Sequence, residues 1–187
     1  MLEEIIIAGF GGQGVLSLGM TLAYAGMLED KEVSWMPSYG PEMRGGTANC
    51  ITILSDSAIS SPVINVFDTA ILLNQPSMEK FGKRVKPGGF LLYEESTVFH
   101  PDFDVQTEAI AIPAAKTALD LGMPKAMNMV MLGALLARKP IVKQESIEKA
   151  LAQVLPEKYH KLIPLNLLAL QAGRTLLLER IRVEEPA

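Results

Sequence analysis

The sequence has 187 residues, of which 49% are hydrophobic and 20% are charged. This composition excludes a disordered chain, and the length fits one domain spanning residues 1–187. The formal net charge of −4 argues against a nucleic-acid-binding protein, because such proteins carry a basic surface.

The chain has a single cysteine, Cys50, and two histidines, His100 and His160. One thiol cannot form an intrachain disulfide or ligate an iron–sulfur cluster, and these residues cannot complete a structural zinc site. Residues 1–4 lack the features of a signal peptide, and the longest apolar run, residues 129–137, is too short to cross a bilayer. The sequence therefore predicts a cytoplasmic protein with no metal and no membrane segment.

The first residues predict a strand, a glycine-rich turn and a helix. Residues 3–9 are rich in isoleucine and end at glycine, which is typical of a strand buried on both faces. The turn Gly9-Phe10-Gly11-Gly12-Gln13-Gly14 leads into a helix over residues 13–29. That helix is apolar nearly all round, so we expect it to be covered on more than one side.

Further strands and then helices follow. A second strand over 32–36 is broken by Pro37, and residues 38–46 form a loop. We expect strands at 47–55, 69–74, 89–94 and 105–112, a short helix at 77–85, and later helices at 114–121, 128–138, 146–154 and 162–182. This order predicts an α/β protein: a three-layer Rossmann-like fold with a mostly parallel central sheet and a helical C-terminal portion.

The spacing of Gly9, Gly11 and Gly14 fits a dinucleotide-binding turn, in which an anion approaches the backbone N–H groups at a helix N-terminus. A site for NAD also needs a carboxylate near the end of the second strand, and residues 36–39 provide none. The turn therefore predicts anion or partner binding rather than an NAD site. The alternative is that the glycines only make a tight connection.

The loop after the second strand contains a phenol, a carboxylate and a guanidinium among three glycines. Because it follows a strand, it should emerge beside the first turn at the carboxyl edge of the sheet. It either binds a ligand or partner through Arg44, or is an internally paired loop closed by Glu42 and Arg44. The candidate contact residues of the two segments are Gly11, Gly12, Gln13, Gly14, Ser38, Tyr39, Gly40, Glu42, Arg44, Gly45 and Gly46.

Together the two glycine-rich motifs resemble the gamma subunit, or gamma domain, of the 2-oxoacid:ferredoxin oxidoreductases. The resemblance continues through Ile59-Ser60-Ser61-Pro62, Lys86-Pro87-Gly88-Gly89 and residues 128–135. It implies a complex that decarboxylates a 2-oxoacid, with 2-oxoglutarate favoured, and gives an acyl-CoA, carbon dioxide and reduced ferredoxin.

The resemblance also implies where the cofactors lie. Thiamine diphosphate, Mg²⁺ and 4Fe–4S clusters are expected in alpha and beta subunits and in a ferredoxin-like delta subunit where one is present, with ferredoxin as the electron acceptor. This chain would hold no catalytic residue and would not be active alone. Its glycine-rich segments would contact coenzyme A phosphates or the thiamine-binding subunit, and the sequence does not choose between them.

Two other classes of protein stay open: a free-standing nucleotide-binding redox protein, and a structural interaction module on the same scaffold. The missing ribose-binding acid argues against the first, and the two polar glycine-rich segments argue against the second. Asn128, in the later helical part, is either a buried amide that ties its helix to a loop or a residue that faces a partner.

Overall fold

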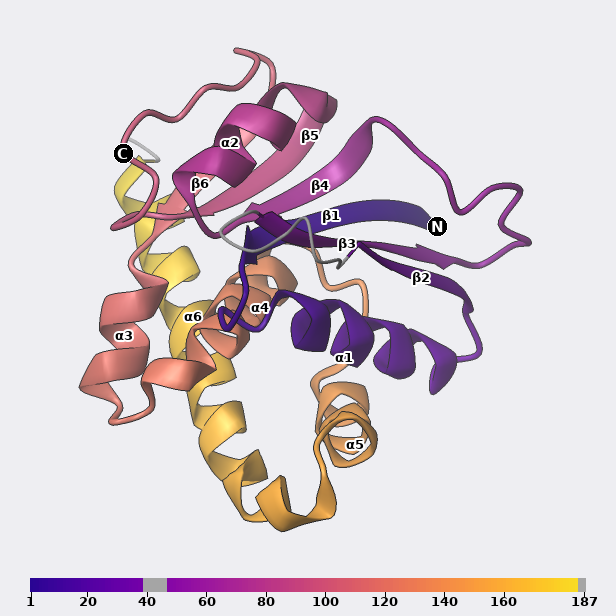
Figure 1. Cartoon of the computed structure of the whole chain (residues 1–187), viewed down its shortest axis with the longest axis vertical. Coiled ribbons are helices and arrows are strands. Elements are labelled where there is room, and N and C mark those ends of the chain that lie inside the picture. The colour runs from indigo at the N-terminus through magenta and orange to yellow at the C-terminus, as the bar shows by residue number, and fades with distance from the viewer. Residues whose placement is uncertain (39–46, 185–187) are drawn as a thin grey trace.

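The computed structural model describes residues 1–38 and 47–184 (Figure 1). Its strands form one sheet in the order β2-β3-β1-β4-β5-β6. The strands are β1 (Leu2–Phe10), β2 (Glu32–Ser38), β3 (Thr47–Ser55), β4 (Phe67–Leu72), β5 (Val85–Glu94) and β6 (Glu108–Ile112). β1, β4, β5 and β6 are parallel, whereas β3 is antiparallel to both of its neighbours, β1 and β2. Of these six strands only β3 runs against the others, which confirms the mostly parallel sheet.

Helices cover the two faces of the sheet unequally (Figure 1). They are α1 (Val15–Met27), α2 (Gln75–Phe81), α3 (Ala114–Asp120), α4 (Met127–Arg138), α5 (Gln144–Val154) and α6 (Ile163–Glu184), with short 3₁₀ turns at Gly82–Arg84, Pro124–Ala126 and Glu157–Leu162. α2 lies on one face, and the other five lie on the opposite face. The fold therefore has the expected three layers and the expected helical C-terminal portion.

The side chains of β1 show how the layers are joined. Ile5 and Ile7 pack in the larger core cluster, with α1, α4 and α6, and Ile6 and Ala8 pack in the smaller one, beside α2. All four are fully buried. The first strand is therefore buried on both faces, as its sequence predicts, because alternate side chains enter opposite layers.

Two element boundaries differ from the sequence prediction for clear physical reasons. α1 begins at Val15 rather than at residue 13, because Gly14 has a φ of +78° and left-handed backbone cannot continue a right-handed helix. β2 continues through Pro37 to Ser38 instead of ending at Met36. A proline can stand within β2 because this is an edge strand, where one row of N–H groups has no partner strand.

Other boundaries shift by a few residues. β4 begins at Phe67, two residues early, and β5 begins at Val85, because these two residues pair across an irregularity in the β4–β5 register. β6 begins only at Glu108, since Val105 lies in the preceding turn and is 97% exposed. α2 ends at Phe81, and a 3₁₀ turn completes the helix predicted for residues 77–85.

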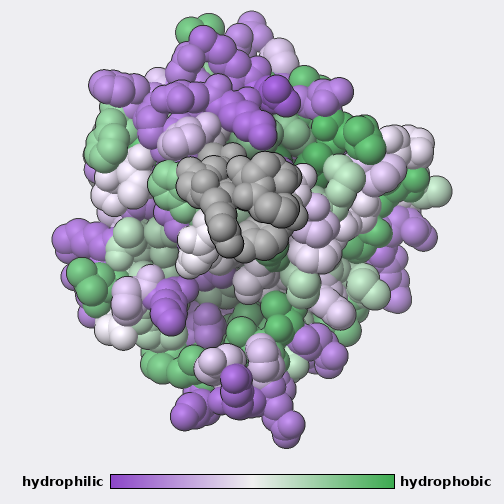
Figure 2. All heavy atoms as spheres, viewed as in Figure 1, coloured by the Kyte–Doolittle hydropathy of each residue, from purple (hydrophilic) through white to green (hydrophobic). Residues whose placement is uncertain are grey.

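The surface has no dominant apolar side in the view of Figure 2: hydrophobic residues lie in separate groups between hydrophilic ones. Hydrophilic residues gather along the top of this view, over the side where α2 and β5 lie. Within residues 1–38 and 47–184, none of the helices combines the length and the apolar character that a bilayer-spanning segment needs.

Candidate functional site

The sheet reverses its winding between the carboxyl ends of β1 and β4. β1 leads into α1 on one face of the sheet, and its parallel neighbour β4 leads into α2 on the other (Figure 1). In open α/β sheets, ligands bind at such a switch point, outside the carboxyl ends of the strands. The glycine-rich turn lies at this point, because it directly follows Phe10, the last residue of β1.

The turn itself needs glycine at two positions. Gly12 has a φ of +90° and Gly14 a φ of +78°, a region in which an L side chain is strained. The backbone N–H of Gln13 donates to the Phe10 carbonyl at 3.2 Å, and Leu18 donates to the Gly14 carbonyl at 2.9 Å. The chain thus closes a tight turn and starts α1 within four residues.

The Gln13 side chain is used inside the protein. Its Oε1 accepts a hydrogen bond from the Phe10 N–H at 2.5 Å, and its Nε2 donates to the Leu73 carbonyl at 3.0 Å. The sequence suggested an amide offered to a ligand, but both polar atoms of this amide already have partners. Gln13 therefore braces the turn against the chain that leaves β4.

Gly11 has no such structural reason to be glycine. It is not among the described residues with positive φ, and no described atom lies within 4 Å of the position of a Cβ there. Gly12 is equally open, whereas a Cβ at Gly14 would lie 2.5 Å from Nδ2 of Asn128. Gly11 and Gly12 thus present bare backbone on the open side of the turn, as expected where a ligand or partner approaches closely.

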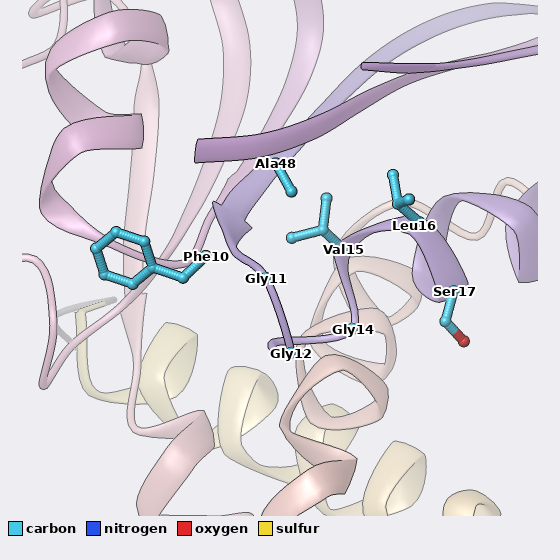
Figure 3. Close-up of a pocket in the computed structure, with 8 residues that line it drawn as sticks. All are labelled: Phe10, Gly11, Gly12, Gly14, Val15, Leu16, Ser17 and Ala48. Atoms are coloured by element: carbon cyan, nitrogen blue, oxygen red, sulfur yellow. The ribbon is translucent and has the colours of Figure 1, made fainter. Parts of the chain in front are cut away.

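A cavity of about 270 Å³ lies against this bare backbone (Figure 3). Its lining residues are Phe10, Gly11, Gly12, Gly14, Val15, Leu16, Ser17 and Ala48. In Figure 3 the side chains of Val15 and Ala48 point toward one another, and the Phe10 ring and the Ser17 hydroxyl point away from that pair. The cavity is therefore lined by glycine backbone and by mostly apolar side chains.

The cavity faces the N-terminus of α1, where the first backbone N–H groups precede the first helical hydrogen bond. The first turn of α1 contains no acidic residue, and no side chain caps it at Gly14. Free N–H groups and the positive end of the helix dipole together favour an anion there. Anion binding at this turn stays a prediction.

A second cavity, of about 420 Å³, lies on the other side of the first turn of α1 and shares Gly14 and Ser17 with the first. Lys125, Asn128 and Tyr159 are among the residues that line it. Sequence reasoning did not bring Lys125 or Tyr159 to the turn, because they lie more than 100 positions further along the chain and no local pattern links them to it.

The second glycine-rich segment leaves and returns at the same edge of the sheet. Ser38, the last residue of β2, pairs with Asn49, and Thr47, the first residue of β3, pairs with Phe10 at the end of β1. Ser38 is exposed. The ends of the segment are thus beside the first turn, with β3 between β1 and β2. The other candidates, Tyr39, Gly40, Glu42, Arg44, Gly45 and Gly46, lie outside the described residues.

Cys50 lies in the core and not at this edge. Its side chain is fully buried against α1, and burial raises the pKa of its thiol to about 12. A neutral thiol is a poor nucleophile and a poor metal ligand. In the described part of the chain, no three His, Cys, Asp or Glu side chains are grouped closely enough to hold a metal ion.

The fold and this edge define a Rossmann-like α/β protein whose glycine-rich turn opens at the switch point of the sheet. Residues 4–176 match the family model described as pyruvate ferredoxin/flavodoxin oxidoreductase. The chain belongs to this family, which confirms the resemblance found in its sequence.

Individual proteins show the same relationship. The ketoisovalerate oxidoreductase subunit VorA of Methanothermobacter thermautotrophicus is 40% identical over 182 residues, which are 97% of this chain and 38% of VorA. The chain thus spans little more than a third of that relative. The keto/oxoacid ferredoxin oxidoreductase gamma subunit from Geobacter sulfurreducens PCA has a TM-score of 0.79 and 30% identity, covering 95% of this chain and 99% of that one.

A larger solved structure contains the same fold. It is the 2-oxoglutarate:ferredoxin oxidoreductase from Magnetococcus marinus with 2-oxoglutarate, coenzyme A and succinyl-CoA bound. Its TM-score is 0.85 at 26% identity, and the match covers 95% of this chain and 31% of that chain.

Proposed function

We propose that this chain acts as the gamma subunit of a 2-oxoacid:ferredoxin oxidoreductase, which decarboxylates a 2-oxoacid oxidatively and transfers the acyl group to coenzyme A. The observation that carries the proposal is an open glycine-rich turn at the switch point of a chain that belongs to this family. The similarity to a solved gamma subunit over almost the full length of both chains supports the same role.

In this proposal the cofactors lie on other subunits. Thiamine diphosphate supplies carbanion chemistry and 4Fe–4S clusters carry electrons to ferredoxin. A cluster does not fit this chain, because its one cysteine is fully buried as a neutral thiol. Alpha and beta subunits, with a ferredoxin-like delta subunit in some complexes, would hold thiamine diphosphate, Mg²⁺ and the clusters.

The contribution of this chain is to bind and orient. The bare backbone at Gly11 and Gly12 and the uncapped start of α1 can bind a phosphate of coenzyme A, with no side chain of the described residues in the way. A bound phosphate would fix the nucleotide end of coenzyme A while its thiol reaches another subunit. The ligands named for the Magnetococcus marinus structure include coenzyme A, which supports this choice over a purely structural contact.

The substrate is proposed as 2-oxoglutarate, which is also named for the Magnetococcus marinus structure. A second candidate is 2-oxoisovalerate, because the VorA relative is named as a ketoisovalerate oxidoreductase subunit. Activity of the purified complex with each 2-oxoacid separately would decide between them.

The decisive experiment is co-purification of the tagged chain, followed by an assay of 2-oxoacid-dependent ferredoxin reduction with and without coenzyme A. We expect thiamine-binding and cluster-binding subunits and coenzyme A-dependent activity. A chain that purifies alone, and whose melting temperature rises on NAD titration, would instead be a free-standing nucleotide-binding protein. A chain that purifies with no such subunits and binds no nucleotide would be an interaction module.

Two variants test the turn and the second glycine-rich segment within that complex. Gly11→Val adds a side chain on the open side, where no described atom would clash, so the chain should fold normally. We expect it to raise the KM for coenzyme A at least tenfold, because the side chain occupies the space that the ligand needs. Arg44→Ala should weaken assembly or raise the requirement for coenzyme A. Wild-type turnover and coenzyme A dependence in both variants would refute the assignment of these two segments.

A further inference from the structure

Asn128 contacts the glycine-rich turn from α4 and lines the second cavity. It lies in the first turn of α4, is 6% exposed, and donates from Nδ2 to the Gly14 carbonyl at 3.3 Å. Three atoms of its side chain lie within 3.0 Å of the position that a Gly14 Cβ would occupy. The amide therefore fills the space that glycine leaves.

The orientation of this amide is fixed by its own helix. The backbone N–H of Met129 donates to Oδ1 of Asn128 at 3.0 Å, so Oδ1 is the acceptor and Nδ2 is directed to Gly14. The Gly14 carbonyl accepts a second hydrogen bond from the Leu18 N–H, the first one of α1. Two donors from different helices thus hold one carbonyl group.

Holding that carbonyl also fixes the N–H on the other side of the same peptide bond. A trans peptide is planar, and its C=O and N–H point in opposite directions. Because the Gly14 carbonyl points toward Asn128 and Leu18, the Val15 N–H points the opposite way, toward the open N-terminal end of α1. Val15 lines the cavity at that end (Figure 3).

We infer that Asn128 is a positioning residue for the anion-binding end of α1: through the Gly14 carbonyl it orients the backbone N–H groups that receive the phosphate of coenzyme A. This inference rests on the proposed function for the ligand, but the contact itself does not. Among the described hydrogen bonds of the Asn128 side chain, Gly14 is the one partner that lines the first cavity. The inference gives this buried amide a function.

The test replaces Asn128 by leucine, which keeps the branching at Cγ but removes both polar atoms, and by aspartate, which keeps the size and shape. Gln171→Ala is the control, since this amide is exposed on α6 and lines neither of the two cavities. The first readout is the amide ¹H–¹⁵N spectrum of the full chain. We expect Gly11, Gly12 and Val15 signals to shift in both Asn128 variants and to stay unchanged in the control.

The second readout is the KM for coenzyme A of the assembled complex. Asn128→Leu should raise it about tenfold, a loss of about 1.4 kcal/mol in binding, because the Val15 N–H is no longer held toward the ligand, with kcat within twofold of wild type. In Asn128→Asp the loss should be largest at neutral pH and should shrink as the pH falls, because a protonated carboxyl group can again donate to Gly14.

The outcomes separate this inference from the proposed function. If the complex shows no coenzyme A dependence while the NMR signals of the turn shift in the Asn128 variants, the proposed ligand is wrong, but Asn128 does position the turn. If the wild-type complex depends on coenzyme A but the variants change neither the spectrum nor the KM, the inference is wrong. Shifted signals with an unchanged KM would also overturn it, because the turn would then be held without consequence for the ligand.

Discussion

Gly133 of α4 and Gly173 of α6 let these two helices touch through their backbones. Each glycine lies against the backbone carbonyl group of the residue three positions before the other glycine. A Cβ on Gly133 would collide with the Leu170 carbonyl, and one on Gly173 would collide with the Val130 carbonyl. The contact is reciprocal. It fixes α6 against α4, the helix that carries Asn128, and so connects the C-terminal helix to the support of the glycine-rich turn.

This reciprocal contact predicts that Gly133→Ala and Gly173→Ala each destabilise the fold. Forcing a methyl group against a backbone carbonyl costs about 3 kcal/mol, and the better helix propensity of alanine returns about 1 kcal/mol. We expect each variant to lose about 2 kcal/mol of unfolding free energy in chemical denaturation. Gln171→Ala, at an exposed position of α6, should change the free energy of unfolding by less than about 0.5 kcal/mol. Equal stability of all three variants would contradict the close contact.

Gln13 should matter for the stability of the turn itself. Gln13→Ala removes the side-chain partner of the Phe10 N–H and one of two side-chain donors to the Leu73 carbonyl, the other being Oγ1 of Thr97. Loss of two hydrogen bonds should lower the free energy of unfolding by about 1–2 kcal/mol, as measured by urea denaturation. Gln153→Ala, an exposed position on α5, is the control and should be neutral. If Gln13 only contacted a ligand, Gln13→Ala and Gln153→Ala would be equally stable in the absence of that ligand.

We expect a larger loss of stability from replacing Glu94, because its fully buried carboxyl group holds several hydrogen-bond donors at the end of β5. It accepts hydrogen bonds from the N–H and Oγ of Ser96, from Oγ1 of Thr97, and from the N–H of Ala115 at the start of α3. Glu94→Ala removes all four and should cost about 3 kcal/mol, measured by thermal or chemical unfolding.

The neighbouring Glu95 provides the control for that variant. It is exposed and forms an ion pair with Arg180 at the surface, so Glu95→Ala should change the free energy of unfolding by less than about 1 kcal/mol. A Glu94→Ala protein as stable as the Glu95→Ala protein would show that the buried network contributes nothing to the fold.

Cys50 gives a prediction about alkaline pH. Burial raises the pKa of its thiol from 9.0 to about 12 in the folded chain, so the unfolded chain loses this proton first as the pH rises. The contribution of the neutral thiol is complete below pH 9 and falls by up to about 1.4 kcal/mol per pH unit between pH 9 and 12. The free energy of unfolding, plotted against pH, should therefore have different slopes for wild type and Cys50→Ala only above pH 9. Equal slopes above pH 9 would refute the raised pKa of the thiol.

The same burial predicts the reactivity of the thiol. At pH 8 the folded chain should not react with a thiol reagent such as DTNB, whereas the chain in denaturant should react fully, with one equivalent. Rapid reaction of the folded protein would show that Cys50 is accessible, contrary to its full burial.

Local patterns predicted much of the site, because its first part lies within one short stretch of chain. The isoleucine run, the glycine spacing and the apolar helix that follows predict a strand, a turn and a helix, and all three are present. The edge shared by the turn and the start of the second segment was also predictable, since β2 runs in the same direction as β1. The antiparallel β3 between them was not, because strand order depends on tertiary pairing.

Contacts between distant residues could not be derived from one sequence. Asn128 reaches Gly14 across 114 positions, and the sequence left open whether this amide contacts a loop or a partner. The structure shows that it contacts the turn. Gln13 likewise looked free, because its acceptor is a backbone carbonyl 60 positions away, and any residue could supply such a carbonyl.

Pro37 has a consequence for the chain when it is free in solution. An exposed edge strand can recruit the same strand of another copy and begin an aggregate. β2 is such an edge, and Pro37 removes one backbone donor from it. At the opposite edge β6 is only five residues long. Both borders of the sheet are therefore poor templates for aggregation, and this protects the chain while it is free in solution.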